Sequence, residues 1–506
     1  MLPSAVPQSA KTAATFTITI PSQSAQVQSR NPRYVSANTQ SVIITLTTVN
    51  GAPFSGSSAI TAANLTPANP SCSGSPLTCT VTVLAMPGSD VFTVNTYDAQ
   101  QTSSSPTTPS GHLLSTASLT INVVEGQNNT PPAPLVLNGV ANTIIATFAA
   151  DPHISGSQTA GYSIIGNRPY TLTVSAQDAS GETIIGPGAP TYSAQSGSNA
   201  IGVAIASANT FTVQVRSFSA TPVTVTITPS QGNATNVAMT TVQELWVANS
   251  GNHTVTAYAP GTNTPIAADT IDTTGGLQYP YGIAFDASGN VWVTNALSIT
   301  AYVPGTNTPI GADTIPLPTN SNATSLAFDT AGHMWYVDLF FATVKAYVPG
   351  TTTPIAADTI TAGLNQPFGI AFDASGNAWI TNLGNNTVTA YVPGTNAPIA
   401  ADTINTGLNF PAGDTFDAAG HLWVANSGNN TVTAYAPGTN TPIAADTIGA
   451  SLNVPTGVAF DGAGHLWVVN DGNNTITAYT PGTNTPIAAD TISAGLNAPI
   501  GLAFSP

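Results

Sequence analysis

The sequence predicts an all-β protein in which two β-sandwiches precede a closed six-bladed β-propeller. The propeller is predicted by a repeat, because the six tryptophans all lie after residue 240, at intervals of 43 to 46 residues. A period near 44 residues with four short strands per unit is typical of a propeller blade. The sandwiches are predicted because residues 12–240 contain short alternating runs, such as TFTITI and VTVTITP, without a long period.

Each repeat contains four segments with strand character and two turn sequences. In the most regular copies, GIAFD leads through the turn DASGN to NVWVTN, and TVTAYVP leads through PGTN to PIAADTI. β-Branched and aromatic residues fill the strands, while glycine and proline suit the turns. The six repeats are marked by Trp246, Trp292, Trp335, Trp379, Trp423 and Trp467.

The two ends of the repeats predict how the ring closes. The first repeat begins at Glu244 without its own copy of GIAF, whereas residues 501–506, GLAFSP, are an additional copy at the end of the chain. The C-terminal segment can therefore supply the first strand of the first blade, which removes the exposed edges of an open sheet. On this basis the propeller occupies residues 241–506.

The unit GIAFDASGNVWVTN, residues 282–295, resembles the NHL-repeat propellers, which are similar to virginiamycin B lyase-like and SMP-30/gluconolactonase-like propellers. The resemblance extends from Glu244 to Ser505 and implies the propeller fold. Many NHL repeats carry Asp and then Arg near the second loop, where this chain has Asn382 and Thr387. The resemblance also implies that an enzyme of this kind would hold a metal with Glu, Asp and Asn, or use His and Glu near Mg²⁺. The repeats contain one glutamate, Glu244.

The first half of the chain resembles bacterial immunoglobulin-like modules in strand number and turn spacing. It divides into an N-terminal tail (1–11), a first sandwich (12–125) and a second sandwich (126–240) that opens with a Pro-rich joint (126–134). No Cys…Trp…Cys core is present, so the resemblance concerns architecture alone. Cys72 and Cys79 flank a Ser-Gly-Ser-Pro turn and are predicted to form a disulfide, with two free thiols as the alternative.

Charged residues are scarce and mainly acidic. They make up 6% of the chain, against about 25% in typical domains, and the net charge is −16. Residues 241–506 hold sixteen acidic residues and one lysine, Lys345. Such a surface repels phosphate, which excludes nucleic acid and anionic lipid as partners. A composition rich in Thr, Ser and Asn predicts a secreted or cell-surface bacterial protein. No export signal is visible at the start, and no apolar run reaches the roughly 18 residues that would span a membrane.

No constellation in the repeats is typical of catalysis or metal binding, so we expect a protein without enzymatic activity or cofactor. His333, His421 and His465 stand in the first turn of their repeats and are predicted to face solvent. His253 replaces an asparagine of the second loop and is the one histidine weighed for a catalytic role.

Two sets of aspartates recur with the repeats. Asp286, Asp373, Asp417 and Asp461 are expected to cap their own turns through side-chain hydrogen bonds. Asp269 and its five equivalents in the sequence ADT are expected to form a solvated acidic rim, with calcium bridging as the alternative.

The candidate binding site is one face of the propeller. Three residues after each tryptophan stands an amide or a carboxylate: Asn249, Asn295, Asp338, Asn382, Asn426 and Asn470. This ring can bind sugars or polar peptide groups, or it can satisfy backbone groups at the strand ends.

Differences between the repeats point to the same face. The segments before GIAF vary and contribute Tyr281 and Phe368, and the third repeat departs most, with Phe340, Phe341 and Lys345. Exposed aromatic residues beside amides would make a contact surface, although such phenylalanines also serve in packing.

These observations predict an exported cell-surface or matrix protein that acts as a binding or assembly module. Its partner would be an extracellular protein, a glycan or a second copy of the chain. One alternative is a subunit of an extracellular fibre, joined by strand addition through the segment AKTAATFTITIPS. The other is a propeller-type lyase or lactonase.

Overall fold

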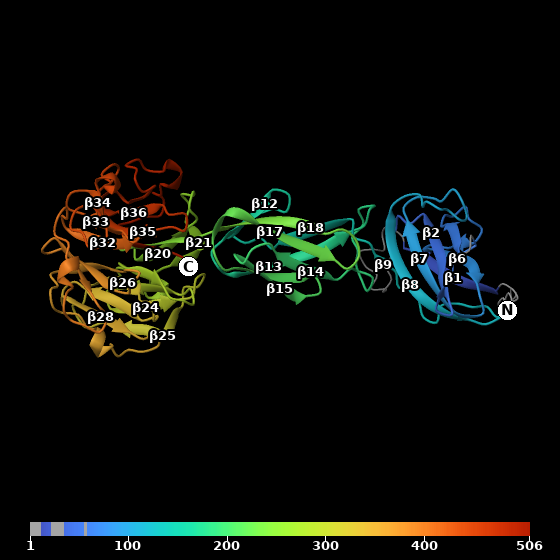
Figure 1. Ribbon diagram of the computed structural model, residues 1–506, viewed down its shortest axis with the longest axis horizontal. Coiled ribbons are helices and arrows are strands. Elements are labelled where there is room, and N and C mark those ends of the chain that lie inside the picture. Colours follow the sequence, from blue (N-terminus) through green and yellow to red (C-terminus); the bar gives the residue numbers. More distant parts are fainter. Residues whose placement is uncertain (1–11, 22–34, 55–57) are drawn as a thin grey trace, which may run out of the picture.

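The computed structural model describes residues 12–21, 35–54 and 58–506 and shows an elongated all-β protein (Figure 1). Three parts follow one another along the long axis in chain order: two units of packed sheets, and then a rounded region that holds the sequence repeats. Among the described residues there is no α-helix, and hence no helix that could cross a membrane. The predicted N-terminal tail, residues 1–11, lies outside the described residues.

The first unit packs two sheets around one hydrophobic core. Its strands are β1 (Thr12–Ile20), β2 (Ser41–Val49), β3 (Ala52–Pro53), β4 (Ile60–Asn64), β5 (Cys72–Ser73), β6 (Leu77–Ala85), β7 (Gly88–Tyr97), β8 (Leu113–Val123) and β9 (Asn138–Gly139). One sheet has the order β1-β6-β5, and the other has the order β3-β2-β7-β8-β9, with β4 beside β2. Phe16 and Phe92 meet edge to face in this core, with ring centroids 5.4 Å apart. β9 extends the unit beyond the predicted joint at 126–134.

Two features of the first unit bear on the sequence predictions. Cys72 and Cys79 face each other across β5 and β6 and form a disulfide, as predicted. Residues 10, 11 and 22 of the segment considered for strand addition lie outside the described residues, and most of the rest is already a strand of its own unit, because β1 pairs with β6 along its full length. One edge of this segment is therefore bonded within the protein, so it is not a free strand donor.

The second unit also packs two sheets around one core. Its strands are β10 (Thr143–Phe148), β11 (Ile154–Ser157), β12 (Gly161–Ile165), β13 (Pro169–Gln177), β14 (Tyr192–Ser196), β15 (Ile201–Ser207), β16 (Thr210–Val215), β17 (Ser219–Pro229) and β18 (Thr235–Val242). The sheet orders are β10-β13-β16-β15 and β11-β12-β18-β17-β14. Alternate residues of β13 are buried, as the alternating sequence predicts.

The repeated region folds into small antiparallel sheets, one for each tryptophan. The first strands are β22 (Ile283–Phe285), β26 (Ala323–Phe328), β29 (Pro367–Phe372), β32 (Pro411–Phe416), β35 (Pro455–Phe460) and β38 (Pro499–Phe504). The second strands are β19 (Leu245–Asn249), β23 (Val291–Thr294), β27 (Met334–Asp338), β30 (Ala378–Asn382), β33 (Leu422–Asn426) and β36 (Leu466–Asn470). The third strands are β20 (Thr254–Tyr258), β24 (Ser298–Tyr302), β28 (Thr343–Tyr347), β31 (Thr387–Tyr391), β34 (Thr431–Tyr435) and β37 (Thr475–Tyr479).

The predicted fourth strand is present in only two of these sheets, as β21 (Ile266–Ile271) and β25 (Pro309–Pro316). In the other four, the sequence AAD forms a short 3-10 turn, at 356–358, 400–402, 444–446 and 488–490. One or two isolated bridges to the third strand remain in each, for example between Val344 and Ile360. The prediction of four strands was wrong here because this outermost segment has only one neighbour to hold it extended.

The C-terminal strand completes the first sheet, as predicted. β38 pairs antiparallel with β19, Leu245 opposite Phe504 and Trp246 opposite Ala503, which gives the sheet order β21-β20-β19-β38. The first strands of successive sheets contact one another in the order β22, β26, β29, β32, β35 and β38, and β38 in turn contacts β22. The propeller-like region is thus joined between its first and last repeats.

Tryptophans hold neighbouring sheets together. Each Trp packs edge to face on the Phe that ends the first strand of the next sheet, for example Trp423 on Phe460, with ring centroids 5.7 Å apart. The buried indole N–H needs an acceptor, and Asp417 supplies it: its Oδ2 accepts from Trp423 Nε1 at 3.0 Å, while its Oδ1 accepts from two backbone N–H groups of its own turn. The predicted turn caps are thereby confirmed and have a second role.

Candidate functional site

The repeated region has two faces, defined by the loops at opposite ends of its strands. Because the strands of each sheet are antiparallel, the turns DASGN and PGTN and their equivalents lie at one end, which we call the proximal face. The second loops and the segments before the first strands lie at the other end, the distal face. The proximal face contacts the second unit: Phe218 lines one surface pocket together with Pro260 and Gly462, and Asn167 lies against Gly289.

The predicted ring of amides lies beneath the distal loops and is buried. All six side chains are at most 4% exposed: Asn249, Asn295, Asp338, Asn382, Asn426 and Asn470. Asn426 is typical. Its Oδ1 accepts from the backbone N–H of Asn409 at 3.1 Å, and its Nδ2 donates to Thr433 Oγ1 at 3.0 Å. The ring therefore satisfies the backbone of the distal loops, which is the alternative that the sequence left open.

In the third repeat the carboxylate of Asp338 takes the place of the amide and binds the distal loop. Its oxygens accept from the hydroxyl of Ser321 and from the backbone N–H groups of Phe340 and Phe341, both at 3.1 Å. The tip of this loop is thereby fixed, and both phenylalanine side chains point away from the core, 68% and 48% exposed. Lys345, in the middle of β28, is half-buried.

Large apolar side chains are exposed at the tips of the distal loops. Besides Phe340 and Phe341, they are Tyr279, Leu297, Phe410 and Val454. The predicted residues Tyr281 and Phe368 are half-buried nearer the first strands. All exposed aromatic side chains of the described repeats thus lie on the distal face, whereas the proximal face exposes valines, including Val348 and Val392.

Three of these residues share a rare backbone conformation. Tyr279, Phe410 and Val454 stand just before proline with φ of 51°, 48° and 49°, and Gln366 and Ala498 at the equivalent positions have φ of 46° and 44°. This left-handed region is unfavourable for bulky and above all for β-branched residues. A contact that recurs between repeats holds it in place: an Asn of the preceding repeat accepts from the backbone N–H, as Asn386 Oδ1 does from Phe410 at 2.7 Å. His253 Nδ1 plays the same part toward Tyr279 at 2.9 Å, which gives this histidine a structural role.

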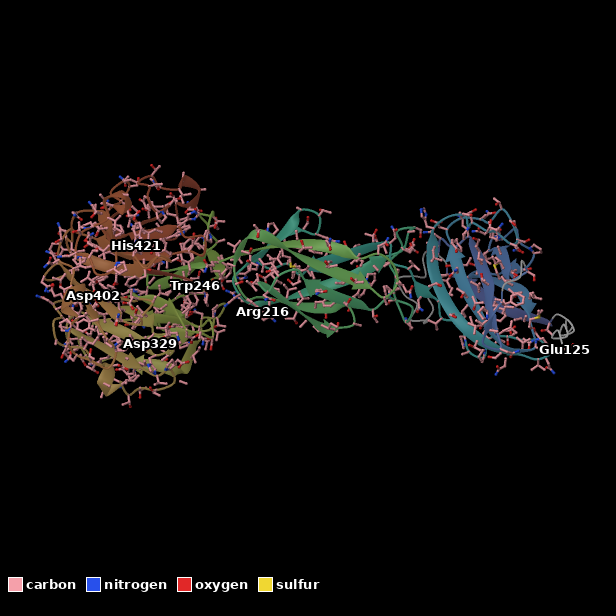
Figure 2. All side chains as sticks on the ribbon, viewed as in Figure 1. Glu125, Arg216, Trp246, Asp329, Asp402 and His421 are labelled. Atoms are coloured by element: carbon pink, nitrogen blue, oxygen red, sulfur yellow. A yellow bond between two sulfur atoms is a disulfide. The ribbon has the colours of Figure 1, made fainter. Side chains whose placement is uncertain are left out.

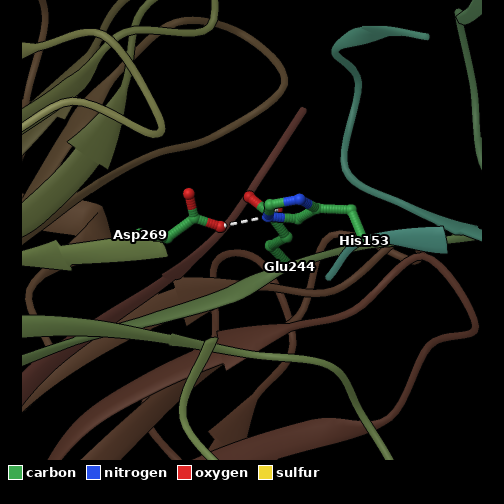
Figure 3. Close-up of side chains that lie close together, drawn as sticks. All are labelled: His153, Glu244 and Asp269. Atoms are coloured by element: carbon green, nitrogen blue, oxygen red, sulfur yellow. Dashed lines mark hydrogen bonds and ion pairs between the residues drawn. The ribbon is translucent and has the colours of Figure 1, made fainter. Parts of the chain in front are cut away.

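A second polar site joins the second unit to the repeats, and the sequence did not reveal it (Figure 3). His153, just before β11, is 3% exposed, and its two ring nitrogens contact Asp151 Oδ1 at 2.7 Å and Asp269 Oδ2 at 2.5 Å. Arg168 Nη2 lies 2.5 Å from Asp269 Oδ1 and 3.3 Å from Glu244 Oε1. We call Asp151, His153, Arg168, Glu244 and Asp269 the junction cluster. The first repeat has no DASGN turn, and Glu244 takes the place of its aspartate: its Oε2 accepts from Trp246 Nε1 at 2.9 Å. Trp246 lies on the side of the repeats that faces the second unit (Figure 2).

The junction cluster sets three carboxylates against two cationic side chains. Burial lowers the pKa of His153, but the carboxylates of Asp269 and Asp151 outweigh it, so that the pKa lies above its ordinary value. Burial raises the pKa of Glu244, against the attraction of Arg168. His153, Glu244 and Asp269 offer ligand atoms within 4.8 Å of one another, as a metal site would. The guanidinium of Arg168 contacts both carboxylates, however, so the cation this site needs is already supplied by the chain.

Two further predictions concerned the turn histidines and the aspartates of the sequence ADT. His333, His421 and His465 lie in their proximal turns, about one-third exposed, each paired with the aspartate four residues before it. The expectation of a solvated rim was wrong for Asp269, whose side chain is fully buried by the second unit. Its equivalents are half-buried or, at Asp358, buried.

A small cavity of about 90 Å³ lies where the first strands of the six sheets converge. Glycine, serine and threonine residues line much of it, together with one residue of each strand at the same position of the repeat. We call these six residues the channel ring: Ile283, Leu326, Ile370, Asp414, Val458 and Leu502. Asp414 was missed by the sequence analysis, although its signal is visible: the repeats read GIAF, SLAF, GVAF and GLAF, and only the fourth complete copy reads GDTF.

No protein-family model and no curated protein matches the sequence. Among solved structures, the chain is similar to virginiamycin B lyase from Staphylococcus aureus, with 18% identity and a TM-score of 0.33 over 40% of this chain and 66% of the lyase. It is also similar to a protein of unknown function from Bacteroides caccae, with 11% identity and a TM-score of 0.44 over 52% of this chain and 99% of that chain. A third, from Bacteroides thetaiotaomicron, has 11% identity and a TM-score of 0.42 over 71% and 92%. At TM-scores this low, the similarities establish no activity or ligand for this chain.

Proposed function

We propose that the protein is an exported binding module whose distal face contacts a partner protein outside the cell. In this proposal two immunoglobulin-like domains, residues 12–125 and 126–240, carry a closed six-bladed NHL-like propeller, residues 241–506. The disulfide between Cys72 and Cys79 suits an oxidising compartment. The single observation that carries the proposal is the gathering of all exposed aromatic side chains of the described repeats on the distal face.

The backbone of the distal loops supports the same reading. A β-branched residue at positive φ costs of order 1 kcal/mol or more, and glycine or asparagine would remove that strain. The chain instead places Tyr279, Phe410 and Val454 there and leaves their side chains exposed. Strain that is maintained by neighbouring contacts and presents a large side chain to solvent is typical of binding sites.

The chemistry of the face favours a protein over a glycan. Sugar binding requires free amides or carboxylates next to an aromatic ring. Here the ring of asparagines is buried and bonded within the protein. Beside exposed asparagines such as Asn385 and Asn429, the distal loops expose aromatic and aliphatic side chains on a region with fifteen excess negative charges, which suits a protein segment with polar, apolar and basic side chains.

The test compares the two faces of the full-length chain. Phe340→Ser with Phe341→Ser removes exposed apolar surface from the distal face, and Val348→Ser with Val392→Ser is the matched control on the proximal face. Saturable binding of the labelled protein to intact cells of the source organism, and to their extracellular material, is measured for each. Removing aromatic anchors of an interface typically costs about 2 kcal/mol or more, so we expect at least a tenfold loss for the distal pair and less than twofold for the control.

Two results would contradict the proposal. A loss confined to the valine pair would move the contact to the proximal face. Binding that survives protease treatment of the cells but is lost after periodate oxidation would make the partner a glycan.

A further inference from the structure

Four of the distal loops carry the same three-residue sequence. Asn-x-Thr, the acceptor sequence for N-linked glycosylation of exported proteins, occurs in the second loops of the first, fourth, fifth and sixth repeats. Its asparagines are all exposed: Asn252, Asn385, Asn429 and Asn473. The residue after each asparagine is left-handed, with φ between 55° and 58°. The four loops therefore share one backbone conformation and present the asparagine in the same way.

The threonine of each loop holds the asparagine amide in one orientation. In the fourth repeat, Thr387 Oγ1 accepts from Asn382 Nδ2 at 3.3 Å and donates to Asn385 Oδ1 at 2.9 Å. In the other three loops the threonine hydroxyl contacts the asparagine Oδ1 at 2.8 to 2.9 Å. Because Oδ1 is the bound atom, Nδ2 is left free, and none of the described residues accepts a hydrogen bond from it.

The two adjacent asparagines of the fourth repeat differ in what they bind. Asn386 Oδ1 accepts from the backbone N–H of Phe410 at 2.7 Å and so holds the next distal segment. Asn385 is bonded only to Thr387 of its own loop among the described residues. A carboxylate or a hydroxyl accepts from a threonine equally well, so this hydrogen bond alone does not explain an amide in all four loops.

The same sequence elsewhere in the chain lacks this arrangement. Four further asparagines stand two residues before a threonine, but in the described structure no threonine hydroxyl binds their amides: Asn64, Asn128, Asn233 and Asn322. The amide of Asn64 is instead bonded at both ends to the backbone of Gln101. The second loops of the second and third repeats lack the sequence and expose Leu297, Phe340 and Phe341. The distal loops thus divide into four that present a free amide nitrogen and two that present apolar side chains.

We propose that Asn252, Asn385, Asn429 and Asn473 are N-glycosylation sites. A glycosyltransferase of the cell uses a glycosyl diphosphate as the donor. A bond forms between Nδ2 and the anomeric carbon of the sugar, and the bond from that carbon to the diphosphate oxygen breaks. The diphosphate leaves with the electron pair, and the proton lost from Nδ2 passes to a base of the transferase. The proposal rests on the proposed function for the export of the chain, and it leaves Phe340 and Phe341 bare.

The test examines the protein as its source organism makes it. Full-length native chain and variants are produced there, purified, cleaved with chymotrypsin and analysed by mass spectrometry. Cleavage after aromatic residues and leucine places the four asparagines in separate peptides, 247–258, 384–391, 424–435 and 468–479. We expect each of these peptides to be heavier by whole sugar residues, with the added mass on the asparagine. Asn440, an exposed proximal asparagine without the sequence, is the internal control and should be unmodified.

Two variants of one threonine separate glycosylation from a purely structural turn. Thr387→Val keeps Asn385 but removes the hydroxyl, so peptide 384–391 should lose its sugar while the other three peptides keep theirs. Thr387→Ser restores an acceptor sequence and should restore the sugar. The three unchanged peptides in each variant show that the chain folds and reaches the transferase.

The other outcomes overturn the proposal. Four unmodified asparagines would do so wherever the protein is recovered. A sugar on peptide 384–391 that persists in Thr387→Val, or fragment ions that place it on a threonine, would make this an O-linked site instead. Fractionation of cells and medium reads export separately, and the distal phenylalanine pair reads the partner contact. Failure of the glycosylation sites is thereby distinguished from failure of the proposed function.

Discussion

The junction cluster makes a quantitative prediction about His153. The side chain of Asp269 is fully buried, and its two cationic neighbours are His153 and Arg168, each 2.5 Å away. Removing one partner of a buried ion pair costs about 3–5 kcal/mol. In His153→Gln, Arg168 stays in place and the amide can still donate one hydrogen bond, so we expect the repeated region to lose about 2 kcal/mol of stability.

The stability that His153→Gln loses should decrease as the pH rises. The pKa of His153 is higher in the folded protein than in the unfolded chain, where it is about 6.5. Its contribution is therefore fully present below pH 6.5 and is lost as the pH rises through the folded-state pKa. The groups facing it are Asp151, Glu244, Asp269 and Arg168, and the three carboxylates favour the protonated ring. The difference between native protein and variant should be largest near pH 5.5 and smallest near pH 9.

The assay is urea unfolding followed by tryptophan fluorescence, because all six tryptophans lie in the repeats and report on that region alone. His421→Gln is the matched control: its ring also pairs with an aspartate, at 2.9 Å, but it is 31% exposed. Exposed pairs contribute about 0–1 kcal/mol, so this variant should unfold close to the native protein. A His153→Gln difference that stays constant or grows between pH 5.5 and pH 9 would refute the reasoning.

Two further predictions concern the packing of the repeats. Deleting residues 501–506 removes most of β38 and leaves β19 with an unpaired edge, so we expect aggregation or a large fall in melting temperature. A change in melting temperature under about 2 °C, worth less than roughly 1 kcal/mol, would show that this pairing does not stabilise the region. Asp417→Ala leaves the buried Trp423 N–H and two turn N–H groups without their acceptor, which should cost about 2 kcal/mol at pH 7. Burial raises the pKa of Asp417, but the hydrogen bonds from Trp423 and His421 outweigh it and the pKa lies below its ordinary value. The stability difference should therefore be fully present above about pH 4 and should decrease as the pH falls through the folded-state pKa, which acid titration of unfolding measures. A difference that stays constant as the pH falls below about 4 would contradict this assignment.

The repeated architecture could be predicted because its signal is periodic. Tryptophan spacing, the GIAF strand and the turn sequences recur six times, and the additional GIAF copy at the C-terminus predicted the pairing of β38 with β19. The fourth strand was overestimated because the sequence ADT recurs in all six repeats, whereas the conformation of this segment depends on its contacts. β21 stays extended where the second unit packs on Asp269, and the equivalent segment at 356–358 turns into a 3-10 helix.

The polar sites were harder to predict, because their partners are distant in sequence. His153 and Asp269 are 116 residues apart, and no local motif connects them. The positions of the asparagine ring, by contrast, could be predicted from the repeats. That the amide binds its own loop is shown only by the structure, in which Asn426 is buried and bonded to the backbone of Asn409. Asp414 breaks a repeated apolar position and was visible in the sequence, and its meaning depends on knowing that this position faces the channel.

The central claim is that the distal face makes the contact with the partner. It is tested most directly by placing the photoreactive residue p-benzoylphenylalanine at Phe410, which is 50% exposed on the distal face, or at Val392, which is 47% exposed on the proximal face. Each full-length protein is bound to cells of the source organism, irradiated and analysed for covalent adducts. We predict protein adducts from position 410 that excess unlabelled native chain suppresses, and none from position 392. Suppressible adducts from position 392 alone, or equally from both positions, would contradict the account.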